Sequence, residues 1–336
     1  MKEKIKELWK LCFDDSEEFV EMYFQMRYKN EINMAIESGN EIISALQMIP
    51  YPMNFCNKQI ATSYISGACT HPEFQNRGAM RQLLSQAFTR MLQGGVYLST
   101  LIPAHNWLFD YYARLGYAPV FRYSTQEISL SGSAPSPDIM IEKISEYQEA
   151  VYSYLNGKLS QCPFRVQHTA EDFRVIMADL ALDNGILLAA KTNNEISGIS
   201  IAVKREGHII INELLSESKE IECSLLHATQ KHYGCDRMTR ILPPDDRFPQ
   251  QALGMARIIN VKEVLQLYAA CFPKDEMQIE VSDKQLSTNN GYYYLNNGKC
   301  MNSAKRLPGS HLALTIGELT EKVFAASSPY MSLMLN

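Results

Sequence analysis

The chain has 336 residues, which at about 150 residues per domain predicts two or three domains. Hydrophobic residues make up 46% and charged residues 21%, as in a globular protein, and the net charge of −5 argues against an extended surface for nucleic acid. The mean hydropathy is −0.20, and no run approaches the ~18 apolar residues of a membrane span. Residues 1–6 lack the apolar core of a signal peptide, which favours a cytoplasmic protein without nucleic-acid or membrane partners.

The cysteines and histidines show neither a disulfide framework nor a metal site. The chain has 8 cysteines and 7 histidines, and no two cysteines form a Cys-x-x-Cys pair. Scattered cysteines in a chain of this length need not pair, and a zinc site requires ligands that cluster. The sequence therefore predicts buried, reduced thiols and no metal.

Two stretches rich in proline and small polar residues divide the chain into three segments. Residues 131–138 form the clearer linker, and residues 243–251 form a weaker one. In the first segment, hydrophobic periodicity and turn residues predict an α/β order. The expected elements are a helix at 3–13, a helix capped by Asp14 or Asp15, strands at 31–37, 41–49 and 59–70, a helix at 80–91, a strand at 95–102, a helix at 106–115 and a strand at 117–130.

The second and third segments show shorter patterns of the same kind. A helix at 170–182 precedes strands at 186–191, 196–203 and 208–215, which tight turns join. In the third segment we expect a helix at 261–271, strands at 277–281 and 291–295, and a helix that starts at the capping box of Thr315 and Glu318. The fold class is therefore α/β or α+β.

One stretch carries the chemistry, at residues 67–80. It leads from a strand through a short loop into an amphipathic helix, whose first N–H groups and positive dipole end prepare an anion site. Gly78 would let a phosphate approach the backbone without a Cβ in the way, and Arg77 and Arg81 add positive charge. This arrangement suits a pyrophosphate.

The loop resembles the acetyl-CoA loop of the GNAT acetyltransferases, Gln/Arg-x-x-Gly-x-Gly/Ala. Gln75 and Gly78 match it, and Met80 stands at the last position, where the Eis-type (enhanced intracellular survival) members also accept a large apolar residue. Residues 110–117 resemble the tyrosine-rich segment of that group. The resemblance implies that acetyl-CoA, as cosubstrate, contacts a set of residues that comprises Ala68, Cys69, Thr70, Gln75, Asn76, Arg77, Gly78, Ala79, Met80, Arg81, Asn106 and Trp107.

The resemblance covers the whole chain and implies three domains. An active GNAT domain spans 1–130, a degenerate GNAT-like domain spans 139–244, and a domain like sterol carrier protein spans 253–336. The first two are mixed-sheet domains and the third is a small α+β domain. Residues 216–222 of the second domain contain three acids and no glycine, which would repel a pyrophosphate, so we expect one acetyl-CoA per chain.

The resemblance also assigns the catalytic groups. Tyr112 would be the general acid that protonates the leaving CoA thiolate, with Tyr111 pointing about 100° away on the same helix. The C-terminal carboxylate of Asn336 would be the general base for the acceptor amine. The N–H groups of Cys69 and Thr70 would hold the thioester oxygen.

Other polar groups near these residues have simpler interpretations. Direct attack by the amine leaves no role for a nucleophilic Cys69. His71 and His105 could relay protons, but polar loop histidines are the simpler interpretation. The acids at 14, 15, 17 and 18 could attract a cationic amine, although capping and solvation explain most of them.

The sequence thus predicts an acetyl-CoA-dependent N-acetyltransferase acting on a primary amine. The alternative is a non-catalytic protein that binds CoA or a lipid. The acceptor, a small molecule or a peptide amine, stays open, and so does homo-oligomerisation.

Overall fold

We describe residues 1–130 and 134–335 of a computed structural model, in which the chain divides into two compact units. The first unit comprises residues 1–121 and 252–329, and the second comprises 122–251 and 330–335. Residues 131–133 of the expected linker and Asn336 lie outside the described residues. No helix among those described is long and apolar enough to cross a membrane.

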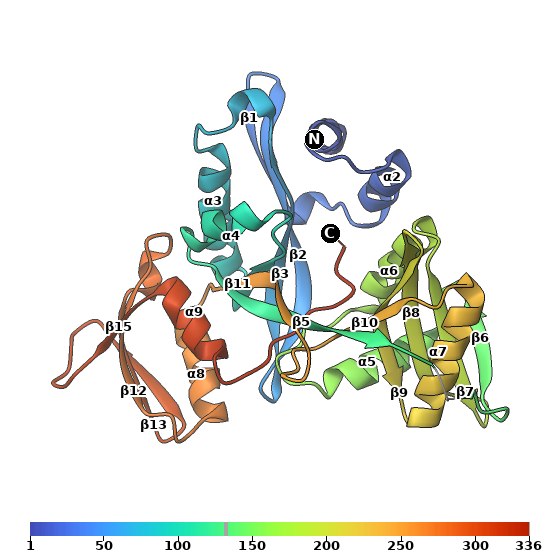
Figure 1. The fold of residues 1–336 in the computed structure, drawn as a ribbon. Coiled ribbons are helices and arrows are strands. Elements are labelled where there is room, and N and C mark those ends of the chain that lie inside the picture. Colours follow the sequence, from blue (N-terminus) through green and yellow to red (C-terminus); the bar gives the residue numbers. More distant parts are fainter. Residues whose placement is uncertain (131–133, 336) are drawn as a thin grey trace. The chain divides into compact units, whose positions relative to one another are not determined.

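The first unit contains one sheet with helices on both faces and a second, smaller sheet (Figure 1). Strand order in the larger sheet is β1-β2-β3-β4-β11-β5, and β5 runs on into the second unit. The elements up to β5 are α1 (Lys2–Cys12), α2 (Glu17–Met26), η1 (Asn30–Ile32), β1 (Asn33–Ser38), β2 (Glu41–Phe55), β3 (Lys58–Thr70), η2 (Pro72–Phe74), α3 (Ala79–Gln93), β4 (Leu98–Leu101), α4 (Asn106–Ala113) and β5 (Ala118–Ile128).

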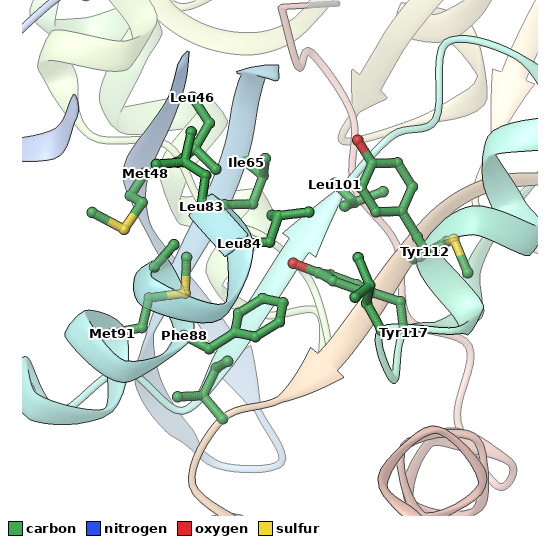
Figure 2. Close-up of a cluster of buried hydrophobic side chains, with 14 of the residues drawn as sticks. Leu46, Met48, Ile65, Leu83, Leu84, Phe88, Met91, Leu101, Tyr112 and Tyr117 are labelled. Atoms are coloured by element: carbon green, nitrogen blue, oxygen red, sulfur yellow. The ribbon is translucent and has the colours of Figure 1, made fainter. Parts of the chain in front are cut away.

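Alternation along β2 and β3 explains how helices cover both faces of this sheet. Leu46, Met48 and Ile65 belong to the core under α3, whereas Ser66 faces the other way and hydrogen-bonds the hydroxyl of Tyr23 on α2 at 2.7 Å. Figure 1 shows α3 on one side of the strands and α1 and α2 on the other. Figure 2 shows how the leucines and methionines of this core meet the rings at its edge.

The expected strand at 41–49 is longer in the structure and reaches Phe55 through Pro50 and Pro52. Beyond Gln47, β2 pairs with β3 and no longer with β1. A proline without N–H is tolerated where one edge of a strand has no partner. The second helix also differs from expectation, since Ser16, and not Asp14 or Asp15, caps it through its hydroxyl.

The segment 252–329 contributes to both sheets of the first unit. Its first strand, β11, pairs antiparallel with β4, and the rest forms a four-stranded sheet β14-β13-β12-β15 against which α8 and α9 pack. The likeness of this small sheet to sterol carrier protein stays a prediction. The elements are β11 (Gln250–Ile258), α8 (Val261–Cys271), β12 (Met277–Ser282), η3 (Ser287–Asn289), β13 (Gly291–Asn296), β14 (Lys299–Ser303), β15 (Leu312–Thr315) and α9 (Ile316–Phe324).

The prediction that the thiols are reduced is wrong for one pair. Cys56, after β2, and Cys271, at the end of α8, form a disulfide with their Cα atoms 6.0 Å apart. The two cysteines are 215 residues apart in sequence, so only the packing of α8 beside the β2–β3 turn brings them together. The other six cysteines, all among the described residues, form no disulfide.

The second unit repeats the plan of the first. Its strand order is β5-β10-β9-β8-β7-β6, and a helix connects the parallel strands β9 and β10 as α3 connects β3 and β4. Its further elements are β6 (Met140–Ile144), α5 (Glu149–Ser160), α6 (Ala170–Leu182), β7 (Ile186–Thr192), β8 (Glu195–Arg205), β9 (His208–Ser216), α7 (Lys219–Tyr233) and β10 (Met238–Leu242).

Candidate active site

The start of α3 is open toward solvent. Gly78 is its N-cap, with φ +86° and no side-chain capping bond, so the first N–H groups of the helix have no acceptor from a cap. A Cβ on Gly78 would meet no atom within 4 Å, which leaves room for a ligand above the helix start. Asn76, two residues earlier, is also left-handed, with φ +61°. This geometry fits a pyrophosphate held by backbone N–H groups.

The loop before α3 is held by its own side chains. Gln75 donates from Nε2 to the carbonyl of Thr70 at 3.3 Å, which closes the loop against the end of β3. The guanidinium of Arg77 lies 5.3 Å from the centre of the Phe74 ring. His71 accepts from the N–H of Glu73 at 3.2 Å and so caps η2, which supports a structural role for this histidine. His105 is the exposed N-cap of α4 and makes no capping bond with its side chain.

Strands β3 and β4 separate just before this loop. Their parallel pairing covers Thr62 with Leu98, Ser63 with Ser99 and Tyr64 with Thr100. Beyond Tyr64 the strands do not pair within the described part of the chain, although β3 continues to Thr70. The edge of β3 at 65–70 therefore offers backbone groups to a ligand, and Ala68, Cys69 and Thr70 lie there.

Tyr112 lies on α4, at the edge of the core (Figure 2). It is 7% exposed, and its ring centre lies 5.2 Å from Tyr111 and 5.7 Å from Tyr117. Figure 2 shows its hydroxyl directed away from Phe88 and Tyr117. Burial, and to a smaller degree Tyr111, raises the pKa of Tyr112 well above its usual range. The phenol is thus protonated at neutral pH, as a general acid must be.

Tyr111 has a different environment. It is half-buried, and burial raises its pKa while the charge of Arg81 opposes the increase. Arg81 lies in the first turn of α3, and Tyr111 packs against the core under that helix. Asn106 and Trp107 begin α4, and Trp107 is 65% exposed, one of the largest exposed apolar side chains described.

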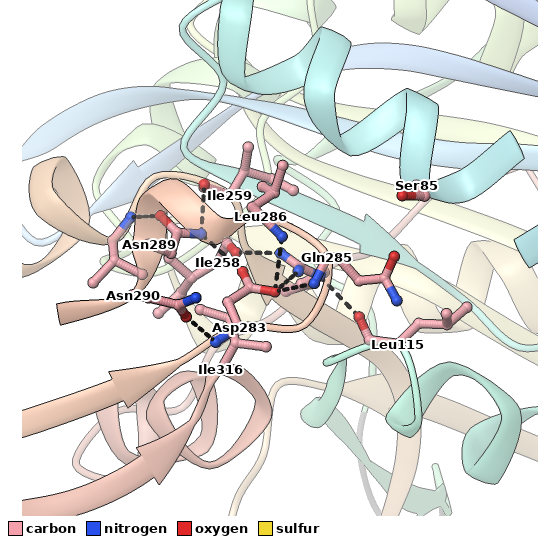
Figure 3. A network of polar contacts seen from close by, with 12 residues as sticks. Ser85, Leu115, Ile258, Ile259, Asp283, Gln285, Leu286, Asn289, Asn290 and Ile316 are labelled. Carbon is pink, nitrogen blue, oxygen red and sulfur yellow. Dashed lines mark hydrogen bonds and ion pairs between the residues drawn. The ribbon is translucent and has the colours of Figure 1, made fainter. Parts of the chain in front are cut away.

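A buried network braces the turn that follows Tyr112. Arg257 on β11 donates from Nε to the carbonyl of Leu115 at 2.9 Å and pairs with Asp283 at 2.7 Å. Both charged side chains are 0% exposed. Figure 3 shows Asp283 accepting from the N–H groups of Gln285 and Leu286.

The same turn requires Gly116. Its φ is +88°, and a Cβ there would lie 2.4 Å from Ile316 of α9. The sequence analysis missed the contact of Leu115 with Arg257 and that of Gly116 with Ile316, both in the segment 252–329. An arginine inside the apolar run 255–259 was the available signal for the buried pair.

The Cys69 thiol is unsuited to attack. It is buried, and its contact with the Cys12 thiol, together with burial, raises its pKa well above the ordinary value. Nucleophilic cysteines have a lowered pKa, which is the opposite shift. Cys12 lies at the end of α1 and its Sγ is 3.5 Å from the carbonyl of Thr70, a neighbour that the sequence did not reveal.

The acids before and within α2 are exposed, and two of them are engaged. Asp15 accepts from the indole N–H of Trp9 at 2.7 Å, and Glu17 pairs with Lys10 at 2.7 Å. Trp9 itself lies against Gly67 of β3, where a Cβ would come within 2.1 Å of its ring.

The comparisons with known proteins agree with this geometry. The family model of the acetyltransferase (GNAT) domain matches residues 2–120. No protein with a curated description matches the sequence. A GCN5-related N-acetyltransferase from Anabaena variabilis ATCC 29413 is similar in structure, with TM-score 0.76 and 17% identity over 98% of this chain and 96% of that one.

Two further structures are similar over nearly the whole chain. A probable N-acyltransferase from Enterococcus faecalis V583 has TM-score 0.76 and 16% identity over 95% of this chain and 86% of that one. Eis1 from Mycobacterium abscessus has TM-score 0.74 and 14% identity over 96% of this chain and 86% of that one. Residues 2–120 are therefore a GNAT acetyltransferase domain, the protein is an acetyltransferase enzyme, and its chain has the fold found in Eis1.

Proposed function

We propose that the protein transfers acetyl from acetyl-CoA to a primary amine by direct attack of the amine on the thioester. GNAT acetyltransferases use acetyl-CoA as cosubstrate. The observation that carries the proposal is that three features follow one another along the first unit. Strands β3 and β4 separate, α3 has an open start at Gly78, and the next helix, α4, carries Tyr112.

The binding step uses the backbone of the first unit. The N–H groups at the start of α3 would hold the pyrophosphate, with Arg77 and Arg81 adding charge. The unpaired edge of β3 would hold the rest of the cosubstrate, and the N–H groups of Cys69 and Thr70 are the proposed contacts of the thioester oxygen.

The chemical step uses one acid and one base. Tyr112 would donate its phenolic proton to the thiolate that leaves, and its raised pKa keeps that proton available. The base would be the C-terminal carboxylate of Asn336, which lies outside the described residues. A terminal carboxyl has a reference pKa of about 3.3–3.7, so it is ionised at neutral pH and needs only to be in reach of the amine.

The decisive experiment is an acceptor screen with release of free thiol as the readout. Aminoglycosides, polyamines, peptide amines and lysine side chains are the amines to compare, each with acetyl-CoA. Calorimetry with acetyl-CoA and with a fatty acyl ligand separates this function from a non-catalytic one. Binding of the fatty acyl ligand without thiol release for any amine would contradict the proposal.

A further inference from the structure

The C-terminal tail, residues 330–335, is docked on the second unit and is not frayed. Tyr330 donates its N–H to the carbonyl of Phe164 at 3.0 Å, and its carbonyl accepts from Val166 at 3.1 Å. The tail thus adds a parallel bridge beside Arg165. Terminal residues are usually poorly ordered unless the fold ties them down, and here backbone bonds do so.

Ser332 is held from both its side chain and its backbone. Its hydroxyl donates to Glu213 at 2.7 Å and accepts from Nη2 of Arg165 at 3.0 Å. Its carbonyl lies 2.9 Å from Nε2 of His168, which must carry the proton because a carbonyl only accepts. We call Arg165, His168 and Glu213 the tail clamp.

The tail clamp is buried and charged. Arg165 and Glu213 pair at 2.5 Å, and their side chains are 4% and 6% exposed. The Arg165 guanidinium also lies 4.8 Å from the centre of the Tyr330 ring. A buried ion pair gives little net stability, but it is costly to leave its groups without partners. The pair therefore favours tail positions that supply a polar group to it.

The observed register supplies the Ser332 hydroxyl as this polar group. Met331 and Leu333 flank Ser332, and a shift by one residue would place an apolar side chain against Glu213 and Arg165. In the observed register Met331 is 0% exposed, and Leu333 packs on the apolar cluster under α5 and α6. Polar and apolar contacts thus select the same register.

We infer that the second unit is a receptor for the chain's own C-terminus, and that Arg165, His168 and Glu213 are positioning residues that dock the tail in one register. The docking itself is independent of the reaction. Its catalytic consequence, through the C-terminal carboxylate of Asn336 as the base, rests on the proposed function. This gives the second unit a role although the start of α7 is unsuited to a pyrophosphate.

The test uses the full chain with Ser332→Ala and, separately, Glu213→Gln. Hydrogen–deuterium exchange of the peptide covering 328–336 reports docking, because the Tyr330 amide is protected by Phe164 in the docked tail. We expect exchange at least about tenfold faster in both variants. In the same samples kcat should fall about tenfold or more while the KM for acetyl-CoA is unchanged, since the proposed acetyl-CoA site at the start of α3 belongs to the first unit and the tail clamp to the second.

The matched control is Glu142→Gln, which removes the carboxylate that pairs with Lys191 on the same unit but away from the tail. It should leave tail exchange and kcat unchanged. Ser332→Ala removes only a hydroxyl of the tail, so it serves even where Glu213→Gln fails to fold.

The outcomes separate the two hypotheses. Unchanged tail exchange in Ser332→Ala and Glu213→Gln overturns the tail clamp. Faster exchange with a lower kcat supports both the tail clamp and the role of the carboxylate. Faster exchange with full kcat supports docking and overturns the proposed base.

Discussion

Two helix starts at equivalent places in the two units have opposite chemistry. In the first unit Gly78 leaves the start of α3 open, with Arg77 and Arg81 beside it. In the second unit the hydroxyl of Ser218 accepts from the N–H of Ile221 and closes the start of α7, and Glu220 lies in its first turn. A repeated backbone plan therefore does not imply a repeated function, because the cap and its neighbours decide whether an anion can bind.

The segments that follow β4 in the first unit and β10 in the second unit differ as well. After β4 the first unit forms α4, which carries Tyr112, whereas residues 243–249 after β10 form no helix. In the second unit Arg240, the last residue of β10 that pairs with β9, donates to the carbonyl of Leu214 at 2.9 Å and to Glu222 at 3.3 Å. Among its described residues, the second unit thus has neither an open helix start at α7 nor a counterpart of α4 with its Tyr112. It holds the C-terminal tail instead.

The largest expected effect comes from removing the proposed general acid, the hydroxyl of Tyr112, from the first unit. Tyr112→Phe should lower kcat by about 10²–10⁴-fold with little change in acetyl-CoA affinity, because only proton donation is lost. Since burial raises the pKa of Tyr112, the wild type should show no loss of kcat from this group below about pH 10. Steady-state kinetics against pH measure both. Full turnover in Tyr112→Phe would transfer the role to another group, and Tyr111→Phe is the matched control.

The second prediction concerns the support of the tyrosine helix. Asp283→Asn leaves Arg257, which is 0% exposed, without a charged partner, and should lower the free energy of unfolding by about 3–5 kcal/mol. Urea denaturation measures this. Asp245→Asn breaks an ion pair with the exposed Arg247 and should change the midpoint little. Equal midpoints for the two variants would show that the buried pair is not a brace.

The third prediction tests what the second unit contributes to the reaction. A short neutral extension after Asn336 should lower kcat by about 10²-fold, because it replaces the terminal carboxylate by an amide. Deleting Leu335 and Asn336 should do the same. The same extension at Met1 is the control and should leave kcat unchanged. Equal turnover in all three chains would make the tail a bystander and assign the base to solvent or to another side chain.

The fourth prediction closes the open helix start. Gly78→Glu places a charged side chain at φ +86° where a pyrophosphate would bind, and should weaken acetyl-CoA binding by at least about tenfold. Gly39→Glu is a matched control, because Gly39 also has a positive φ, +64°, and open space around its Cβ. Calorimetry should show an affinity loss for the first variant only. Similar affinities for both would contradict the binding site.

Local patterns predicted much of the fold. The helix at 170–182 begins at a capping box and was predicted with the bounds of α6, and the periodic helix at 80–91 is α3. Helix α5 was missed, because Asn156 and Gly157 interrupt its apolar positions. Both residues weaken a helical pattern although the buried side chains still recur every fourth residue.

Contacts between distant segments could not be predicted. Arg257 on β11 meets Asp283 in the loop after β12, and Cys56 in the β2–β3 turn meets Cys271 at the end of α8. The cysteine pairing has no local signal, and the arginine in the apolar run 255–259 indicates a buried partner without identifying it. The loop at 75–78 could be found from the sequence since its function requires a glycine at a left-handed position within a short motif.

The smallest expected effect comes from removing the side-chain cap at the start of α7 in the second unit. Ser218→Ala removes the side-chain cap of α7 and should cost about 1 kcal/mol of stability, as should Ser16→Ala at the cap of α2. It should not create a second acetyl-CoA site, because Glu220 and Glu222 still place negative charge in the first turn. Calorimetry should give one acetyl-CoA per chain for both variants. A second binding event in Ser218→Ala alone would mean that the hydroxyl cap, and not the acids, excludes the pyrophosphate from the second unit.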